Sequence, residues 1–342
     1  MSEKLRVVHV GCGGIASAWM NHVSKMPEVE IVAMVDVGLD AARAKAEKHN
    51  IQNVEFGTNL EEMLKKFKPD AVFDCTPPEV HVDVTLTALK HGCHVMGEKP
   101  LADSMENAKK MVRAAQDAGK IYTVMQNRRY MPDIRRLVDF LKSGAIGTPH
   151  TVNCDFYLGP HFGGFREEMK HVLLLDMAIH TFDQARMITG ASPVSVYCKD
   201  WNPVGSWYNY DASAQAIFEM SDGIVYNYRG SWCAEGVGTT WESSWRVQGS
   251  TGGVLWDGAQ DFKAQRRVGM EGKKPIIEDV EVPSFQGELP FEGHGGPIYD
   301  FVQCVLHGGT PMTICTDNIK SLAMVFAAIE SSETGKVVEV KI

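Results

Sequence analysis

The sequence lacks several features that mark specialised classes of protein. No run of apolar residues approaches the length that a transmembrane helix needs. The eight cysteines are scattered and no two are three residues apart, so neither a zinc knuckle nor a disulfide framework is indicated. Internal repeats and low-complexity linkers are missing as well. We therefore expect a globular protein with reduced, mostly buried cysteines.

An excess of positive charge is also missing. The formal net charge of −9 disfavours nucleic acid or an anionic membrane as the main partner. The 44% hydrophobic and 23% charged residues exclude disordered and fibrous classes, and 342 residues suffice for two domains. The stretch RVVHVGCGGIASA imitates a signal peptide, but its histidine and glycines fit a strand and a turn better. We expect a cytoplasmic protein.

Short apolar segments alternate with amphipathic helical segments in the first third of the chain. This alternation is typical of a parallel sheet with helices on both faces, and it predicts a doubly wound α/β domain over residues 1–125. The expected strands are 5–10, 29–35, 70–75, 93–97 and 121–125.

The pattern changes after about residue 126. Helical patterns remain at 132–144 and 171–190, but residues 193–283 alternate in the manner of strands separated by glycine turns. Within them, SAQAIFEMSDGIVYNYRGSW predicts two strands joined at Ser221-Asp222-Gly223. We therefore expect a second, α+β domain over residues 126–342, built on an open, mostly antiparallel sheet. A helix near 316–331 could pack back on the first domain.

A glycine turn joins the first expected strand to the first expected helix. In VVHVGCGGIA, Gly11, Gly13 and Ala16 fill the three positions of the dinucleotide fingerprint G-x-G-x-x-G/A, with Gly14 and Ile15 in the same turn. The turn alone is a weak signal, because glycine turns also join strands to helices that bind nothing.

Asp36, at the end of the second expected strand, strengthens the signal. An acidic residue there would accept hydrogen bonds from the adenosine ribose, although a helix N-terminal charge is the simpler alternative. A carboxylate would repel a 2′-phosphate, so NAD is favoured over NADP. Arg43 and Lys45 on the next helix could still reach a phosphate.

Two groups of charged residues indicate chemistry. The stretch VMGEKPLADS puts Glu98 and Lys99 at a strand end of the predicted sheet, where ligands bind in such folds, although an isolated lysine would ordinarily be a solvated surface residue. In LLLDMAIHTFDQAR, Asp176 and His180 share one helix face in an apolar segment. A carboxylate and an imidazole one turn apart can orient a hydroxyl and move its proton.

A metal site built from His171, Asp176 and His180 is disfavoured, since no established ligand spacing supports that set. We expect no metal.

Together these motifs resemble those of the Gfo/Idh/MocA family, which includes glucose–fructose oxidoreductase and inositol dehydrogenases. The resemblance covers essentially the whole chain. It is carried by the segments GCGGIA, DCTPPEVHVD, GEKPLA, NRRYMP and LLDMAIHTFDQAR. It implies a Rossmann domain followed by a substrate domain, NAD(P)-dependent oxidation or reduction of a hydroxyl of a sugar, inositol or related polyol, and a homodimer or homotetramer.

The resemblance also implies roles for individual residues. Lys99 corresponds to the active-site lysine, and Asp176 and His180 correspond to the substrate-binding acid and the acid/base; whether Lys99 or His180 accepts the proton stays open. The expected substrate contacts are Lys99, Arg128, Asp176 and His180. The expected cofactor contacts are Gly11, Gly13, Gly14, Ile15, Asp36, Thr76, Pro77, His81, Glu98, Lys99 and Asn127.

Two other functions fit the same architecture. One is an NAD-dependent glycosidase that oxidises its substrate transiently, and the other is a non-catalytic NAD-binding regulator. The joint presence of Lys99, Asp176 and His180 weighs against the regulator.

The glycine-rich stretch GPHFGGFR is suited to a loop that lines a pocket. The many aromatic residues of the second domain are expected in its core or in a subunit interface more than in stacking on sugars.

Overall fold

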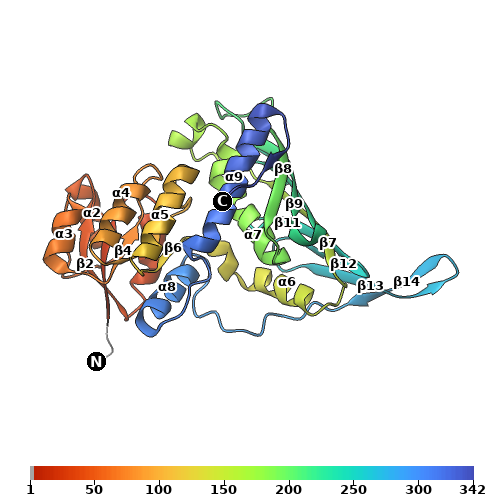
Figure 1. Ribbon diagram of the computed structural model, residues 1–342, viewed down its shortest axis with the longest axis horizontal. Helices are drawn as coiled ribbons and strands as arrows, with labels where there is room; N and C mark the ends of the chain where they lie inside the picture. Colours follow the sequence, from red (N-terminus) through yellow and green to blue (C-terminus); the bar gives the residue numbers. More distant parts are fainter. Residues whose placement is uncertain (1–3) are drawn as a thin grey trace. The chain divides into compact units, whose positions relative to one another are not determined.

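The structure is a computed structural model that describes residues 4–342 (Figure 1). Contacts between residues divide the chain into two compact units. Unit 1 is the chain up to Tyr130 with Leu289–Leu322 and Ile342, and unit 2 is Met131–Glu288 with Ala323–Lys341. These units differ from the predicted division into residues 1–125 and 126–342, because the chain returns to unit 1 after Glu288 and divides again within a C-terminal helix, α9 (Cys315–Thr334).

Unit 1 is built on a six-stranded parallel sheet with the order β3-β2-β1-β4-β5-β6. Its strands are β1 (Leu5–Val10), β2 (Val29–Val35), β3 (Glu55–Gly57), β4 (Ala71–Asp74), β5 (His94–Gly97) and β6 (Tyr122–Val124). All four residues of β4 are buried, as expected for a strand covered on both faces. The predicted doubly wound sheet is confirmed, and its strand order reverses between β1 and β4, where such sheets bind ligands.

The helical elements of unit 1 include those of the predicted alternation. They are α1 (Ala16–Val23), α2 (Leu39–Lys48), α3 (Leu60–Phe67), α4 (His81–Lys90), α5 (Met105–Asp117), the 3₁₀ turn η1 (Asn127–Tyr130) and α8 (Gly295–His307). The elements β3 and α3 escaped the sequence analysis, since a three-residue strand shows no periodicity. Helix α8 completes the core from far along the chain: the Phe301 ring lies 6.0 Å from that of Phe73, which lies 5.3 Å from Trp19.

Unit 2 is built on a nine-stranded sheet with the order β14-β13-β12-β11-β7-β10-β9-β8-β15. Its strands are β7 (Pro149–Tyr157), β8 (Pro193–Trp201), β9 (Ser213–Met220), β10 (Val225–Ser231), β11 (Ser244–Gly249), β12 (Gly252–Trp256), β13 (Phe262–Glu271), β14 (Lys274–Val280) and β15 (Val338–Glu339). The pair β7–β10 is parallel and the other pairs are antiparallel, which confirms the mostly antiparallel prediction. The predicted turn at 221–223 joins β9 to β10.

One face of this sheet packs against α7. The remaining helical elements of unit 2 are α6 (Pro132–Lys142), the 3₁₀ turn η2 (Gly164–Glu168), the π-helix η3 (Leu173–Ala178), α7 (Ile179–Thr189) and the end of α9. The ring of Phe182 in α7 lies 4.8 Å from Phe218 and 5.3 Å from Tyr228. Trp232 and Trp245 are fully buried, so the prediction of aromatic core residues is confirmed for them.

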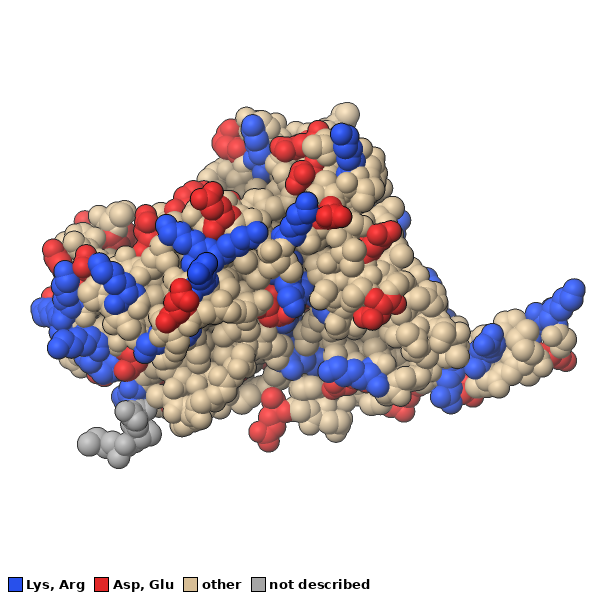
Figure 2. Space-filling view, viewed as in Figure 1, with Lys and Arg blue, Asp and Glu red and all other residues tan. Residues whose placement is uncertain are grey.

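The hairpin of β13 and β14 extends beyond the rest of the sheet as an arm (Figure 1). Acidic and basic side chains are interspersed on the visible face, the arm included (Figure 2). Within residues 4–342, no helix combines the length and the apolar character needed to cross a membrane.

Candidate functional site

The glycine turn after β1 forms an open cradle at the start of α1. Gly11 has φ +84°, and a Cβ there would lie 2.6 Å from the carbonyl carbon of Cys75, so only glycine fits. A Cβ at Gly13 or Gly14 would meet nothing within 4 Å. The turn therefore leaves open space beside the backbone at a helix N-terminus, where an anionic group such as a pyrophosphate can approach. Ile15 is 40% exposed at the same end.

Asp36 is held at the end of β2 by the backbone of this cradle. Its Oδ2 accepts a hydrogen bond from the Cys12 amide at 2.7 Å, and its Oδ1 accepts one from Gly38 at 2.9 Å. The next residue, Val37, is 99% exposed. A fixed carboxylate beside an apolar side chain at this strand end suits the ribose and adenine of a dinucleotide.

The two basic residues that could compete for a 2′-phosphate have other partners. Lys45 Nζ donates to Ser17 Oγ at 2.7 Å, and Arg43 lies 3.8 Å from Asp40 in an exposed ion pair.

The loops that follow β4 and β5 are tied together by His81. Its Nε2 lies 2.8 Å from the carbonyl oxygen of Thr76, and its Nδ1 lies 3.0 Å from that of Pro100. The side chain is 1% exposed. His81, expected to contact the cofactor, thus directs both ring nitrogens to backbone carbonyls, while Thr76 and the exposed Pro77 stay at the loop surface.

Glu98 is buried beneath the same loops. Its Oε1 accepts from Trp19 Nε1 at 2.6 Å and its Oε2 accepts from the Lys99 amide at 3.0 Å. Burial raises the pKa of Glu98, against the lowering effect of these donors and of the Lys99 cation. The carboxyl predicted to lie beside the nicotinamide ribose therefore also anchors α1 to the turn that carries Lys99.

Lys99 is half-buried and follows Glu98 at the carboxyl end of β5. Sequence analysis missed a neighbour in unit 1, His294, which precedes α8. Its pKa is lowered, first by burial and then by the positive charge of Lys99. His294 lies almost two hundred residues downstream in EGHGGP, so no local pattern links it to the lysine.

Asn127 and Arg128 lie in η1 of unit 1, with Arg128 only 5% exposed. The neighbouring Arg129 is a structural residue: its guanidinium binds the Met312 carbonyl at 3.2 Å and Asp317 at 3.0 Å.

Asp176 and His180 are both buried in unit 2, at 8% and 9% exposure. The predicted helix over 171–190 forms, but its first part is the π-helix η3, which holds Asp176, while His180 lies in the first turn of α7. π-Helical turns are frequent at functional sites, and no residue pattern predicts them. Lys99 belongs to unit 1 and this pair belongs to unit 2, so the assignment of all three to one active site is a proposal.

Arg166 is a second residue that the sequence analysis missed. Its Nε donates to Asp176 Oδ2 at 2.8 Å. Its guanidinium lies over the rings of Phe165 and Phe162, at 4.9 and 5.6 Å from their centroids. The only sequence signal for Arg166 was its place in the glycine-rich stretch GPHFGGFR, which was expected to line a pocket. The sequence did not indicate that Asp176 would be its partner.

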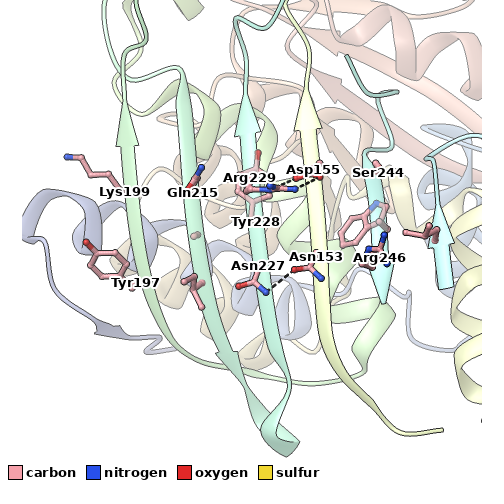
Figure 3. Close-up of a pocket in the computed structure, with 14 residues that line it drawn as sticks. Asn153, Asp155, Tyr197, Lys199, Gln215, Asn227, Tyr228, Arg229, Ser244 and Arg246 are labelled. Carbon is pink, nitrogen blue, oxygen red and sulfur yellow. Dashed lines mark hydrogen bonds and ion pairs between the residues drawn. The ribbon is translucent and has the colours of Figure 1, made fainter. Parts of the chain in front are cut away.

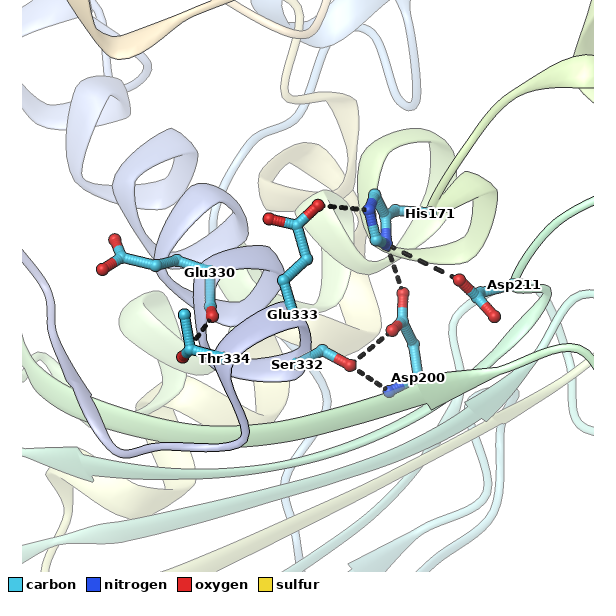
Figure 4. A network of polar contacts seen from close by, with 7 residues as sticks. All are labelled: His171, Asp200, Asp211, Glu330, Ser332, Glu333 and Thr334. Carbon is cyan, nitrogen blue, oxygen red and sulfur yellow. Dashed lines mark hydrogen bonds and ion pairs between the residues drawn. The ribbon is translucent and has the colours of Figure 1, made fainter.

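His171 anchors the segment that leads into η3 (Figure 4). Its Nδ1 lies 2.6 Å from Asp200 Oδ2 and 3.9 Å from Asp211, and its Nε2 lies 3.4 Å from Glu333. The hydrogen bond to Asp200 raises the pKa of His171 despite its burial. These contacts are those of a histidine paired with carboxylates. Of the trio weighed as a metal site in the sequence, His171 belongs to this network and Asp176 to the Arg166–Asp176 pair.

A hollow of about 690 Å³ lies elsewhere, on the sheet face turned away from α7 (Figure 3). Arg229 and Asp155 form a two-bond ion pair across β10 and β7, with both bonds at 2.7 Å, and Asn227 bonds Asn153 at 3.0 Å. Tyr197 and Ile217 on neighbouring strands are about half exposed, at 46% and 51%.

Residues 5–126 match the model of an oxidoreductase family with an NAD-binding Rossmann fold, GFO_IDH_MocA, and residues 134–255 match the GFO/IDH/MocA C-terminal domain. The chain belongs to the GFO/IDH/MocA oxidoreductase family. The predicted resemblance is therefore confirmed, and the protein is an oxidoreductase with an NAD-binding Rossmann fold.

Curated members of the family are similar over most of the chain. An uncharacterized protein, y4oX, from Sinorhizobium fredii is 28% identical, over 98% of this chain and 96% of its own length. The 1,5-anhydro-D-fructose reductase of Ensifer adhaerens is 24% identical, over 97% of both chains. The D-glucoside 3-dehydrogenase of Escherichia coli is 31% identical, over 60% of both chains.

A solved oxidoreductase from Agrobacterium radiobacter, in complex with NAD+, L-tartaric acid and magnesium, has the same fold. Its TM-score is 0.84 at 22% identity, covering 98% of both chains. A levoglucosan dehydrogenase in complex with NADH and levoglucosan has a TM-score of 0.83 at 18% identity, covering 99% of this chain and all of that one.

Proposed function

We propose that this protein transfers a hydride between the nicotinamide of NAD and a hydroxyl-bearing carbon of a sugar, inositol or related polyol. The observation that supports this most is the buried pair Asp176 and His180, set in an otherwise apolar helical segment of the substrate domain. Relatives named as a D-glucoside 3-dehydrogenase and a myo-inositol 2-dehydrogenase point to the same substrate class.

The residues of unit 1 suit the binding of NAD. The open backbone at Gly13 and Gly14 leaves room for a pyrophosphate, and Asp36 offers a carboxylate for the adenosine ribose. The same carboxylate would repel a 2′-phosphate, and the engagement of Lys45 with Ser17 further favours NAD over NADP.

When bound, NAD supplies the hydride acceptor or donor. In the oxidation direction, His180 takes the proton of the substrate hydroxyl, and Asp176 orients the neighbouring hydroxyl and the imidazole. Lys99 stabilises the negative charge that develops on the same oxygen by its ammonium group. Each of these groups contributes orientation or charge stabilisation, so removing one should slow turnover without removing the cofactor site.

The test is an absorbance assay at 340 nm with a panel of sugars, inositols and sugar acids, using NAD and NADP. Lys99→Ala and His180→Ala should each lower kcat by about a hundredfold or more while NAD affinity, measured by calorimetry, stays within a factor of a few. Near-normal turnover in either variant would show that its role is wrongly assigned. Product formation without net NADH would instead support the glycosidase, and NAD binding without any turnover would support the regulator.

Asp36 is expected to set the choice of cofactor. Asp36→Ser removes the charge that would oppose a 2′-phosphate, so the ratio of kcat/KM for NAD over NADP should fall by about tenfold or more, equal to 1.4 kcal/mol. Lys48→Ser, an exposed change at the far end of the following helix, is the control and should leave the ratio near its starting value.

We further propose that the chain forms a homo-oligomer through the exposed face of the nine-stranded sheet. This face exposes the large side chains Tyr197 and Ile217 beside charged residues of the strands. Such a surface is suited to contact with the same surface of a second copy.

A further inference from the structure

The Arg166–Asp176 pair joins a positive hydrogen-bond donor to a negative hydrogen-bond acceptor, which restricts the kind of substrate that it can bind. The bond at 2.8 Å joins the Arg166 side chain, which is 32% exposed, to the Asp176 side chain, which is 9% exposed. The pair is thus sheltered on the acidic side and reachable on the basic side. Arg166 belongs to η2, while Asp176 belongs to η3, which leads into α7 and the proposed acid/base His180.

We propose that Arg166 and Asp176 together bind two adjacent hydroxyl groups of an uncharged sugar or cyclitol, so that Arg166 is a residue that determines substrate specificity. This inference rests on the proposed function and deepens it. It assigns to the site a neutral vicinal diol, in preference to a sugar acid.

Hydrogen-bonding capacity supports the diol. An ionised carboxylate only accepts hydrogen bonds, and a guanidinium only donates them, while a hydroxyl does both. One substrate hydroxyl can therefore donate to Asp176 while its neighbour accepts from Arg166. The guanidinium has five N–H donors in a fixed planar fork, and its bond from Nε to Asp176 uses one of them.

Charge supports a neutral substrate. The two opposite charges of the pair cancel at the distance of a bound molecule. A substrate carboxylate that approached Arg166 would also approach Asp176, and like charges at such short range repel. Because the arginine is already paired, the Arg166–Asp176 pair itself adds no net positive charge that would attract an acid.

The surroundings of Arg166 supply an apolar surface. Phe162 and Phe165, which lie against the guanidinium, are 57% and 68% exposed, and Trp241, 6.3 Å from the Phe162 ring, is 47% exposed. A cluster of large aromatic side chains exposed on a protein surface often marks a binding site. Aromatic rings here suit the C–H face of a sugar ring whose hydroxyls meet the charged pair.

The first experiment compares neutral sugars with their uronates, in which a carboxylate replaces the primary alcohol at C6. The wild-type enzyme is assayed with D-glucose and D-glucuronate, and with methyl α-D-glucoside and its uronate. A second comparison sets myo-inositol against monodeoxy-inositols, each of which lacks one hydroxyl group. We expect the neutral member of each pair to have the higher kcat/KM, and loss of one of two adjacent hydroxyls to lower kcat/KM by about tenfold or more, as for a hydrogen bond to a charged group. A preference for the uronates would overturn the inference.

The second experiment alters the arginine. Arg166→Met removes the donor, and Arg166→Lys keeps the charge but loses the planar fork. We expect KM for the best neutral substrate to rise by about tenfold or more in Arg166→Met, with a smaller change in kcat, and partial recovery in Arg166→Lys. Lys170→Met is the matched control, since it removes a positive charge of the same loop whose ammonium lies over Tyr210. An unchanged KM in both Arg166 variants would overturn the proposal.

Binding separates this inference from the proposed function. Calorimetry in the presence of NADH measures the affinity of the same compounds without turnover. If neutral diols bind and Arg166→Met weakens them while no panel member reacts, the inference stands and the proposed reaction fails. If the panel reacts and uronates bind as tightly as their neutral partners, the reaction stands and the inference fails. If no compound binds or reacts, both are wrong.

Discussion

At the scale of single residues, two glycines of the cradle are expected to matter for different reasons: Gly11 for the stability of the fold and Gly13 for the binding of NAD. Gly11 needs its left-handed backbone and has Cys75 directly behind it. Gly11→Ala should lower the free energy of unfolding by about 2 kcal/mol or more, because an alanine pays for the left-handed region and for the clash. Urea denaturation followed by circular dichroism measures this.

Gly13 provides the matched variant, since a Cβ there would enter open space. Gly13→Ala should change stability by no more than about 0.5 kcal/mol, yet weaken NAD binding by about tenfold or more, because the added methyl occupies the space left for the pyrophosphate. Unchanged NAD affinity in Gly13→Ala would show that the cofactor does not approach this turn.

His94 makes stability depend on pH. Burial lowers its pKa from 6.5 to about 4, and its Nδ1 accepts a hydrogen bond from the Ile121 amide at 3.0 Å. Between pH 6.5 and 4 the unfolded chain binds a proton that the folded chain does not, so stability falls as the pH falls through this window.

The variant His94→Gln keeps an acceptor but cannot titrate. On lowering the pH from 7 to 4.5, the wild type should lose about 2 kcal/mol more of its unfolding free energy than His94→Gln does. The exposed His150→Gln should follow the wild type. Parallel pH profiles for the wild type and His94→Gln would contradict the prediction.

At the scale of elements, His171 joins three parts of unit 2 to the start of the π-helix. It meets Asp200 at the end of β8, Asp211 in the following loop and Glu333 near the end of α9. Burial alone would raise the pKa of Asp200, but hydrogen bonds from His171 and Ser332 lower it overall. His171 itself has φ +52°, an uncommon backbone conformation for a residue with a Cβ.

Because these partners raise the pKa of His171, its contribution to stability is full below pH 6.5 and is lost as the pH rises through the folded-state value. His171→Gln should therefore be less stable than the wild type by about 1–3 kcal/mol at pH 6, with a gap that narrows toward pH 9. Exposed Glu333 adds little to this sum. A gap that stays constant with pH would show that His171 acts only through packing.

At the scale of the whole molecule, the proposed homo-oligomer would use the exposed face of the nine-stranded sheet. If a second copy covers it, Ile217→Glu should place a charge in an apolar contact and shift the protein toward a monomer, as seen by light scattering after gel filtration. Val204→Glu, in a fully exposed loop position, should leave the assembly unchanged. A wild type that is monomeric at micromolar concentration would contradict the proposed oligomer.

The sequence by itself determined the strand and helix alternation of unit 1, the glycine turn with Asp36, and the antiparallel hairpin at 221–223. These features are local, because each depends on apolar periodicity or on the conformational freedom of a few neighbouring residues. The family followed from the same local motifs, since their residue types and order along the chain suffice for it.

Only the tertiary structure decided how distant segments meet. It brought α8 under the first sheet, paired β7 with β10 in parallel, set His294 near Lys99, joined Arg166 to Asp176 and turned both nitrogens of His81 toward backbone carbonyls. The π-helix around Asp176 belongs here too. Such features depend on contacts between residues remote in sequence. Buried charges and ring nitrogens need hydrogen-bond or ion-pair partners, and no local pattern encodes which partner the fold will supply.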